Sequence, residues 1–261
     1  MYVEQYGDGP EIYLAFHGWG GNHREFAPLA ARLSPEAALH SVDLPGYGRS
    51  PRPREESLTA VANEVREYAS GLGKSVTLIG FCSGAVIAMM VARAEPARYK
   101  RMVLIDPFAY LPWYFRIFTA GEFGRRAYQT TFASAAGRRI ANWILQRKQT
   151  QDTDFMAAFS RVDHAVTHCY LEWFARFGSL EPYRVLSLPI DIAVGEHTFA
   201  AVRKSVCDFC ALWPHARTQP LRHVGHLPMV KGAGQLAELI FGGPAFRRAR
   251  LSVSEKKARS S

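Results

Sequence analysis

Residues 78–90, LIGFCSGAVIAMM, consist of two apolar runs and a short junction between them, with Gly80 and Gly84 at the ends of the junction. The first run has the length of a buried strand, and the second has the length of a helix that packs on a sheet. Glycines let the backbone approach a neighbouring element where a side chain would clash. The central residue of the junction, Cys82, is then held in a strained conformation. The stretch therefore predicts a buried strand that turns sharply into a helix.

The alternation of strand and helix continues along the chain. The strand-like apolar runs are IYLAFHG, ALHSVDL, SVTLIGF, RMVLID and PIDIAVG. The helical patterns are REFAPLAARL, SLTAVANEVREYAS, GAVIAMMVARA and AAVRKSVCDFCALW. Continuous apolar runs are typical of parallel strands that are buried on both faces. The sequence thus predicts an α/β fold with a mainly parallel sheet, helices on both faces, and ligands at the carboxyl ends of the strands.

Between Pro107 and Tyr183 the alternation lapses, and a helical stretch rich in aromatic residues intervenes. We expect residues 1–106 and 184–243 to form the core, residues 107–183 an inserted helical cap, and residues 244–261 a basic, flexible tail. The aromatic residues at the start of the cap are Phe108, Tyr110, Trp113, Tyr114, Phe115, Phe118, Phe123 and Tyr128. We expect most of them to pack the cap onto the core and the remainder to line an apolar substrate tunnel.

The net charge of +9 is concentrated at the end of the chain. Residues 244–261 carry six basic side chains and Glu255, which together account for +5. No groove-reading motif accompanies this charge, so no nucleic acid is expected as a partner, whereas a basic surface is compatible with an acidic carrier protein. The sequence has neither a signal peptide nor an apolar run of membrane-spanning length, so we expect a cytoplasmic protein without a membrane span.

The four cysteines, at positions 82, 169, 207 and 210, are too few for a disulfide framework in a chain of 261 residues. Cys207 and Cys210 form a C-x-x-C pair on an expected helix, and we interpret them as small core residues because no second pair completes a metal site. Histidines lack paired metal-ligand spacing, and no dinucleotide fingerprint or phosphate-binding loop is present. Neither a metal nor a cofactor is expected.

Gly80-Phe81-Cys82-Ser83-Gly84 fits the G-x-nucleophile-x-G elbow between a strand and a helix, with Cys82 at the apex. Here the chain resembles the α/β-hydrolase superfamily, from about Tyr6 to Phe241 without the cap. Three further motifs carry the resemblance in the family's order, and these are Phe16-His17-Gly18-Trp19-Gly20, Asp43-Leu44-Pro45-Gly46-Tyr47-Gly48-Arg49-Ser50 and Gly225-His226-Leu227-Pro228. The resemblance implies an α/β-hydrolase fold.

The resemblance also implies roles for individual residues. The backbone amides of Trp19 and Ser83 are expected to form the oxyanion hole, and His226 to act as the base. His17 is expected to support its loop, and His223 to be a residue at a strand end.

The acid is expected at a less common position. Most members of the family keep it in a G-x-x-D segment, which is Gly195-Glu196-His197-Thr198 in this chain. Some members, including many polyketide and peptide-synthetase thioesterases, place the acid after the strand that follows the elbow. Asp106 holds that position, so it is assigned as the acid, with Glu196 in reserve.

A cysteine at the apex would form a thioester intermediate, which keeps more acyl reactivity than an oxygen ester. The expected function is therefore that of a thioesterase or acyltransferase. A hydrophobic ester or thioester, carried on an acyl carrier protein or on CoA, would pass its acyl group to water or another nucleophile. The alternatives are a non-catalytic binding protein of this fold and a hydrolase of a small lactone or ester. Haloalkane dehalogenation is set aside because that reaction needs a carboxylate at the elbow.

Overall fold

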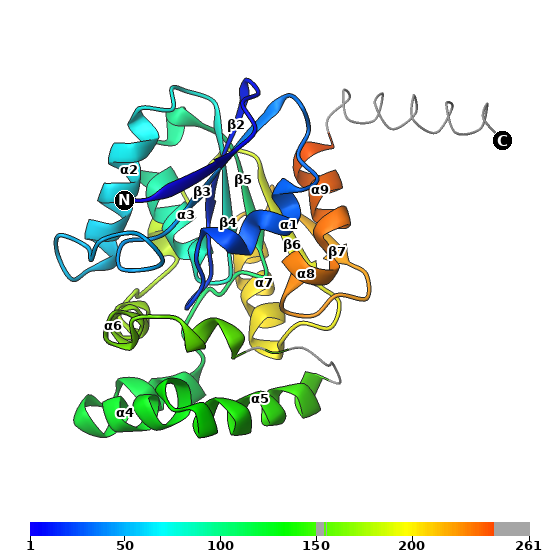
Figure 1. Cartoon of the computed structure of the whole chain (residues 1–261). Helices are drawn as coiled ribbons and strands as arrows, with labels where there is room; N and C mark the ends of the chain where they lie inside the picture. Colours follow the sequence, from blue (N-terminus) through cyan, green and yellow to red (C-terminus); the bar gives the residue numbers. More distant parts are fainter. Residues whose placement is uncertain (150–153, 155, 243–261) are drawn as a thin grey trace.

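The computed structural model describes residues 1–149, 154 and 156–242 (Figure 1). Its centre is a seven-stranded sheet in the order β1-β3-β2-β4-β5-β6-β7, in which only β1 is antiparallel to its neighbour. The strands are β1 (Val3–Tyr6), β2 (Glu11–Phe16), β3 (Ala37–Val42), β4 (Val76–Phe81), β5 (Tyr99–Ile105), β6 (Ile190–Gly195) and β7 (Arg217–Leu221). The predicted α/β class and mainly parallel sheet are confirmed.

Helices cover both faces of the sheet (Figure 1). The longer ones are α2 (Leu58–Ser70), α3 (Gly84–Ala94), α4 (Gly121–Tyr128), α5 (Ala135–Gln149), α6 (His164–Ala175), α7 (Ala200–Leu212) and α9 (Ala233–Phe241). Short helical turns are α1 (Ala27–Ala30), α8 (Pro228–Lys231), η1 (His23–Phe26), η2 (Pro96–Arg98), η3 (Trp113–Thr119), η4 (Gln129–Ala133), η5 (Ala157–Ser160) and η6 (Glu181–Tyr183). One apolar cluster joins α2, α3 and α7 to one face of the sheet, and a second joins α1, α8 and α9 to the other.

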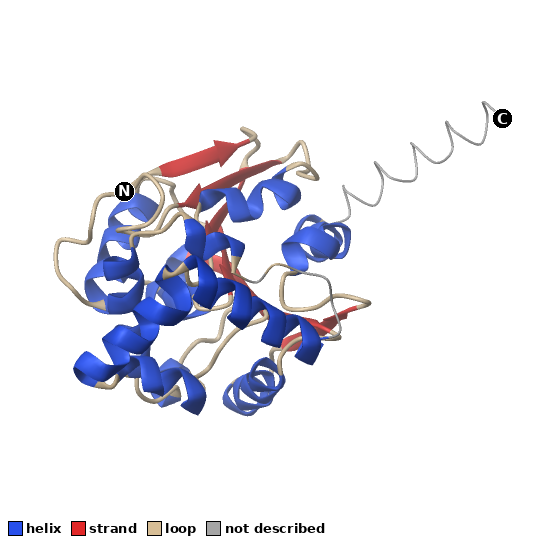
Figure 2. Cartoon of the chain, turned by 60° about the horizontal axis from the view of Figure 1, so that its bottom comes forward, coloured by secondary structure: helices blue, strands red, loops and turns tan. Residues whose placement is uncertain are grey.

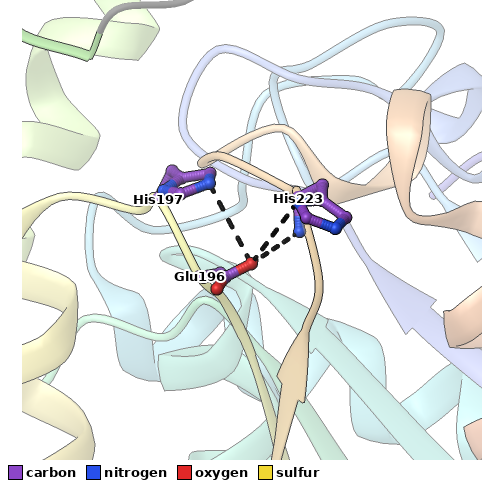
Figure 3. Close-up of side chains that lie close together, drawn as sticks. All are labelled: Glu196, His197 and His223. Carbon is purple, nitrogen blue, oxygen red and sulfur yellow. Dashed lines mark hydrogen bonds and ion pairs between the residues drawn. The ribbon is translucent and has the colours of Figure 1, made fainter.

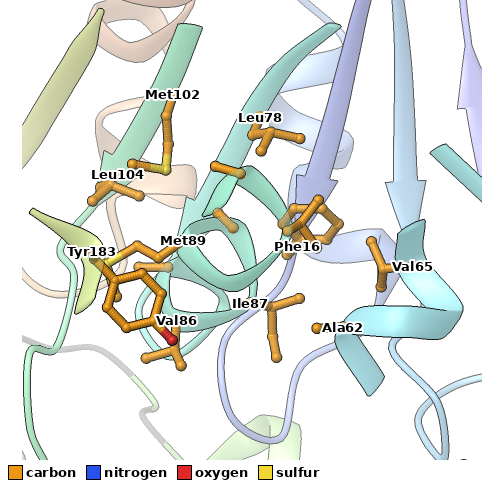
Figure 4. Close-up of a cluster of buried hydrophobic side chains, with 14 of the residues drawn as sticks. Phe16, Ala62, Val65, Leu78, Val86, Ile87, Met89, Met102, Leu104 and Tyr183 are labelled. Carbon is orange, nitrogen blue, oxygen red and sulfur yellow. The ribbon is translucent and has the colours of Figure 1, made fainter. Parts of the chain in front are cut away.

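Helix α3 is the most deeply buried helix of the core, because eight of its eleven residues are shielded from solvent. Val86 and Met89 pack in the cluster that also holds Leu78 of β4 and Leu104 of β5 (Figure 4). Fully burying such side chains contributes roughly 1.5–3 kcal/mol each. The helix that follows the elbow is therefore held firmly, and its amino end is a rigid platform.

Three expectations about single elements need correction. The pattern REFAPLAARL does not form one helix but the short turns η1 and α1, which are consecutive in the chain, and Pro28 lies at the second position of α1, where it has no N–H to donate. Strands β1 and β7 lie at the sheet edges and were not expected, since their residues are mostly polar or exposed. Cys207 lies on the predicted helix, α7, but is exposed and is not a core residue.

Residues 107–183, called the inserted segment below, contribute η3, α4, η4, α5, η5, α6 and η6 between β5 and β6. Figure 1 shows α4 and α5 as a layer that lies beyond the carboxyl ends of the strands. A small apolar cluster, which includes Tyr128, Phe132 and Phe159, holds this layer together. The expected tail, residues 244–261, lies outside the described residues. None of the described helices is long and apolar enough to cross a membrane.

Candidate active site

The junction between β4 and α3 forms a tight elbow with Cys82 at its apex. Cys82 has a left-handed backbone, with φ of +53°, and its N–H donates to the carbonyl of Ile105 on the neighbouring strand. A Cβ on Gly80 would lie 2.6 Å from the Cα of Ala85, and one on Gly84 would lie 2.3 Å from the carbonyl oxygen of Phe16. Both glycines are therefore required by close backbone contacts, as the sequence predicts, and the thiol is raised at the amino end of α3.

His226, Asp106 and Thr198 meet beside the elbow, although they come from three different loops. The Nδ1–H of His226 donates to Asp106 Oδ2 over 3.1 Å, and the hydroxyl of Thr198 donates to the same oxygen over 2.7 Å. Thr198 Oγ1 also lies 3.3 Å from His226 Nδ1. The other carboxylate oxygen, Asp106 Oδ1, accepts the N–H of Gly195. Asp106 is fully buried, so its carboxylate is held in one orientation by three donors.

The imidazole of His226 is the link between this carboxylate and the elbow. It interacts with the sulfur of Cys82, and the rings of Phe81, Phe108 and Phe199 surround it at centroid distances of 4.8–5.7 Å. Burial disfavours the charged ring, but the hydrogen bonds and charges of Asp106 and Cys82 outweigh it and raise the pKa of His226 to about 10. The geometry thus favours an imidazolium between two acidic groups.

Two backbone amides near the thiol donate to no other residue in the described part of the chain. They belong to Trp19 and Ser83, and both residues line the cavity above Cys82. The indole of Trp19 fixes its loop, because Nε1–H donates to the carbonyl of Thr167 over 2.8 Å and the ring packs edge-on against Phe159 and Phe132. This anchor to the inserted segment could not be inferred from the motif.

His17 supports the same loop from below. Leu44 N–H donates to Nε2, so Nδ1 carries the proton and donates to the carbonyl of Gly18 over 2.8 Å. The ring is fully buried, and burial lowers the pKa of His17 to about 4, so the ring stays neutral. Such a ring has the structural role that the sequence predicts.

A cavity of about 920 Å³ lies above Cys82 and His226. Five of the eight aromatic residues singled out at the start of the inserted segment line it, and these are Phe108, Tyr110, Tyr114, Phe115 and Phe118. More of them face the cavity than the sequence indicates. Trp113 and Phe123 are instead exposed, and Tyr128 is buried in the segment's own cluster. The cavity is large enough to hold an apolar acyl chain, since its volume lies in the range of ligand-binding pockets.

Glu25 is a cavity residue that the sequence analysis missed. Its Oε2 accepts the N–H of Gly18, over 2.8 Å, and a Cβ on Gly18 would lie 3.1 Å from the Cβ of Cys82. Burial raises the pKa of Glu25 to about 7, and the bond from Gly18 opposes that shift. A second carboxyl group therefore lies close to the elbow in space, with Gly18 between them. No motif marks it, because Glu25 belongs to the turn η1.

Glu196, the reserve acid, is exposed and groups with His197 and His223 (Figure 3). Its Oε2 accepts the N–H of His223 over 2.8 Å and lies 4.0 Å from a ring nitrogen of both His197 and His223. One ligand atom of each of these three exposed residues lies within 4.8 Å of the others. Sequence spacing does not reveal this grouping, because His197 and His223 follow different strands.

A family model described as the alpha/beta hydrolase family matches residues 13–239. A pimeloyl-[acyl-carrier protein] methyl ester esterase from Aeromonas hydrophila is 25% identical over 261 aligned positions, which cover 91% of this chain and 96% of that protein. Its counterpart from Aeromonas salmonicida is 34% identical, but the match spans only 40% of either chain.

Solved structures agree in fold. A thermophilic esterase from Thermogutta terrifontis superposes with a TM-score of 0.74 at 18% identity and covers 92% of this chain and 91% of its own. At that identity the likeness concerns the arrangement of strands and helices alone.

Proposed function

Because this chain belongs to the alpha/beta hydrolase family, we propose that it is an acyl-handling enzyme with Cys82 as nucleophile, His226 as base and Asp106 as acid. The observation that carries the proposal is the position of the His226 imidazole, which interacts with the sulfur of Cys82 and donates a hydrogen bond to the buried carboxylate of Asp106. These groups face an apolar cavity and two amides without partners among the described residues. We propose that the inserted segment is the cap that closes this site.

The reaction begins when the Cys82 sulfur attacks the carbonyl carbon of an ester or thioester. The carbonyl oxygen takes up the negative charge, and the amides of Trp19 and Ser83 stabilise it. When the tetrahedral intermediate collapses, the bond to the leaving alcohol or thiol breaks and protonated His226 supplies the proton. The acyl group then remains on Cys82 as a thioester.

The second half of the reaction returns the enzyme to its starting state. Neutral His226 takes a proton from water or another nucleophile, which attacks the thioester carbonyl. The carbon–sulfur bond breaks, and Cys82 leaves as a thiolate beside the imidazolium. Asp106 keeps Nδ1–H oriented throughout, so that Nε2 faces the sulfur.

The cavity supports a hydrophobic acyl group as the substrate. Its aromatic lining favours a hydrophobic chain, and its volume exceeds that of a small polar lactone. The related methyl ester esterases are named for an acyl-carrier-protein substrate. We therefore propose a donor carried on an acyl carrier protein or on CoA, with water, an alcohol, an amine or a thiol as the acceptor.

Intact-mass measurement after brief exposure to octanoyl-pantetheine and related donors tests the proposal. We expect an adduct of one acyl mass on the wild type, none on Cys82→Ala, and an unchanged adduct on the matched variant Cys169→Ala. Peptide mapping should place the group on Cys82. A protein that binds the donor but forms no adduct and shows no turnover would instead be the non-catalytic binding protein.

A further inference from the structure

The inserted segment exposes an unusual number of large apolar side chains. In the part of the chain that the structure describes, nine large hydrophobic residues are exposed, and seven of them lie between Trp113 and Ile144. Trp113 exposes 82% of its surface and Phe123 exposes 66%. The remaining two, Val185 and Val230, lie elsewhere. Scattered exposed hydrophobics are ordinary in a folded protein, whereas a concentration on one segment indicates an interaction surface.

Helix α5 shows that packing does not explain these residues. Its inward side, with Ala141 and Leu145, contacts the cluster around Tyr128 and Phe132. Ile140 and Trp143, one turn apart on its other side, are exposed. A helix that only covered the core would carry polar residues at these positions.

Exposed basic residues occur on the same elements as the exposed apolar ones. Five exposed arginines, at 116, 125, 126, 139 and 147, lie on η3, α4 and α5, and Glu122 is the single acidic residue between Trp113 and Arg147. The guanidinium of Arg147 lies 4.1 Å above the ring of Trp143. We call these arginines, together with Trp113, Phe123, Ile140, Trp143 and Ile144, the outer face.

The outer face is continuous with the cavity. Tyr114 and Ile144 are both partly exposed and both line the cavity that leads to Cys82. In Figure 1, α4 and α5 form the layer at one extreme of the molecule, and Figure 2 brings this side forward. A surface placed against this layer would therefore meet the entrance to the site.

We propose that the outer face docks on an anionic phospholipid surface, so that the apolar cavity opens toward the bilayer. Tryptophan and isoleucine side chains enter the boundary between headgroups and acyl chains, while arginines pair with lipid phosphates. A second copy of this chain is disfavoured as the occupant, because five arginines would face five others. Lipid binding does not depend on the proposed function. Only the further step, in which an acyl substrate enters the cavity from the membrane, rests on the proposed function.

Co-sedimentation with vesicles tests the proposal. Full-length protein should bind vesicles of phosphatidylcholine mixed with phosphatidylglycerol, and should bind phosphatidylcholine alone at least about tenfold more weakly. Trp113→Ser/Trp143→Ser and Arg125→Gln/Arg126→Gln should each lower binding by about tenfold or more. The matched controls Val185→Ser/Val230→Ser and Arg24→Gln/Arg32→Gln should bind as the wild type does.

The tests separate this surface from its rivals. Cys82→Ala should bind vesicles normally, so a failure of catalysis and a failure of docking are distinguishable. The proposal is overturned if no vesicles bind, or if binding survives both outer-face variants and is lost only in Arg247→Gln/Arg248→Gln/Arg250→Gln. It is likewise overturned if the outer face instead mediates dimerisation or captures an acidic carrier protein without binding lipid.

Discussion

Replacing Thr198 with valine tests how the imidazole is oriented. Thr198 is 2% exposed, and its hydroxyl donates to Asp106 Oδ2 over 2.7 Å while lying 3.3 Å from His226 Nδ1. Valine has nearly the same shape but no hydroxyl, so a buried carboxylate oxygen loses a donor. A hydrogen bond to a charged group contributes about 1.5–3 kcal/mol. If that energy acts in the transition state, kcat/KM should fall roughly 10- to 100-fold.

The assay is the release of p-nitrophenol from its octanoyl ester, with thermal unfolding to show that each variant is folded. Thr198→Ser keeps the hydroxyl and should retain most of the activity, which separates the hydrogen bond from packing. A folded Thr198→Val enzyme that works within twofold of the wild type would refute this role.

Moving the proposed acid provides an independent check on the same geometry. Asp106→Asn removes the anion and should lower kcat/KM by about a hundredfold or more. Asp106→Asn/Thr198→Asp places a carboxylate where the family usually keeps it, close to His226 Nδ1, and should recover part of that loss. An equally inactive double variant would show that the two positions are not interchangeable in this chain.

Three further outcomes are expected. Burial raises the pKa of Glu25 from 4.5 to about 7, so the wild type should lose stability as the pH rises through this interval. Urea unfolding of Glu25→Gln should not show this loss, and the same pH dependence in both proteins would contradict the prediction. Gly84→Ala should lower the free energy of unfolding, measured by urea titration, by about 2–4 kcal/mol because its Cβ would meet the carbonyl of Phe16. The matched variant Gly234→Ala on α9 places a Cβ with no atom within 4 Å and should leave that free energy unchanged or raise it. Trp19→Phe loses the bond to Thr167 and should lower kcat more than it raises KM, whereas a change in KM alone would assign Trp19 to binding.

The central strands could be predicted because each is buried on both faces and is therefore a continuous apolar run. The edge strands could not. Strand β7, RTQPL, has four exposed residues and Pro220, and β1 has only four residues, so neither carries an apolar signature. Edge strands owe their conformation to the neighbour with which they pair, which a pattern in one segment does not record.

The candidate site shows a similar division. The elbow was predictable because its glycines are imposed by contacts within a few residues of Cys82 and with the adjacent strand. In the sequence, Thr198 is notable only because it stands where most members of the family have an acid. In the fold, its hydroxyl contacts the carboxylate of Asp106, which follows a different strand. Glu25 carries no sequence signal because it lies on the turn η1, outside the motifs, although its partner Gly18 is only seven residues away. The surface group of Glu196, His197 and His223 could not be predicted because His223 lies 27 residues from Glu196 and follows another strand.

The proposed reaction requires that Cys82 and His226 share a proton, and the pH dependence of alkylation measures this directly. Since the pKa of His226 is raised to about 10, the imidazolium should persist through neutral pH beside the sulfur and activate it. Cys82 should then react with iodoacetamide at a nearly constant rate across that range, and His226→Ala should abolish this behaviour. Cys210, whose pKa is raised by burial, should react faster only as the medium becomes alkaline. If Cys82 follows the same course as Cys210, or if His226→Ala leaves its rate unchanged, the imidazole does not activate the thiol.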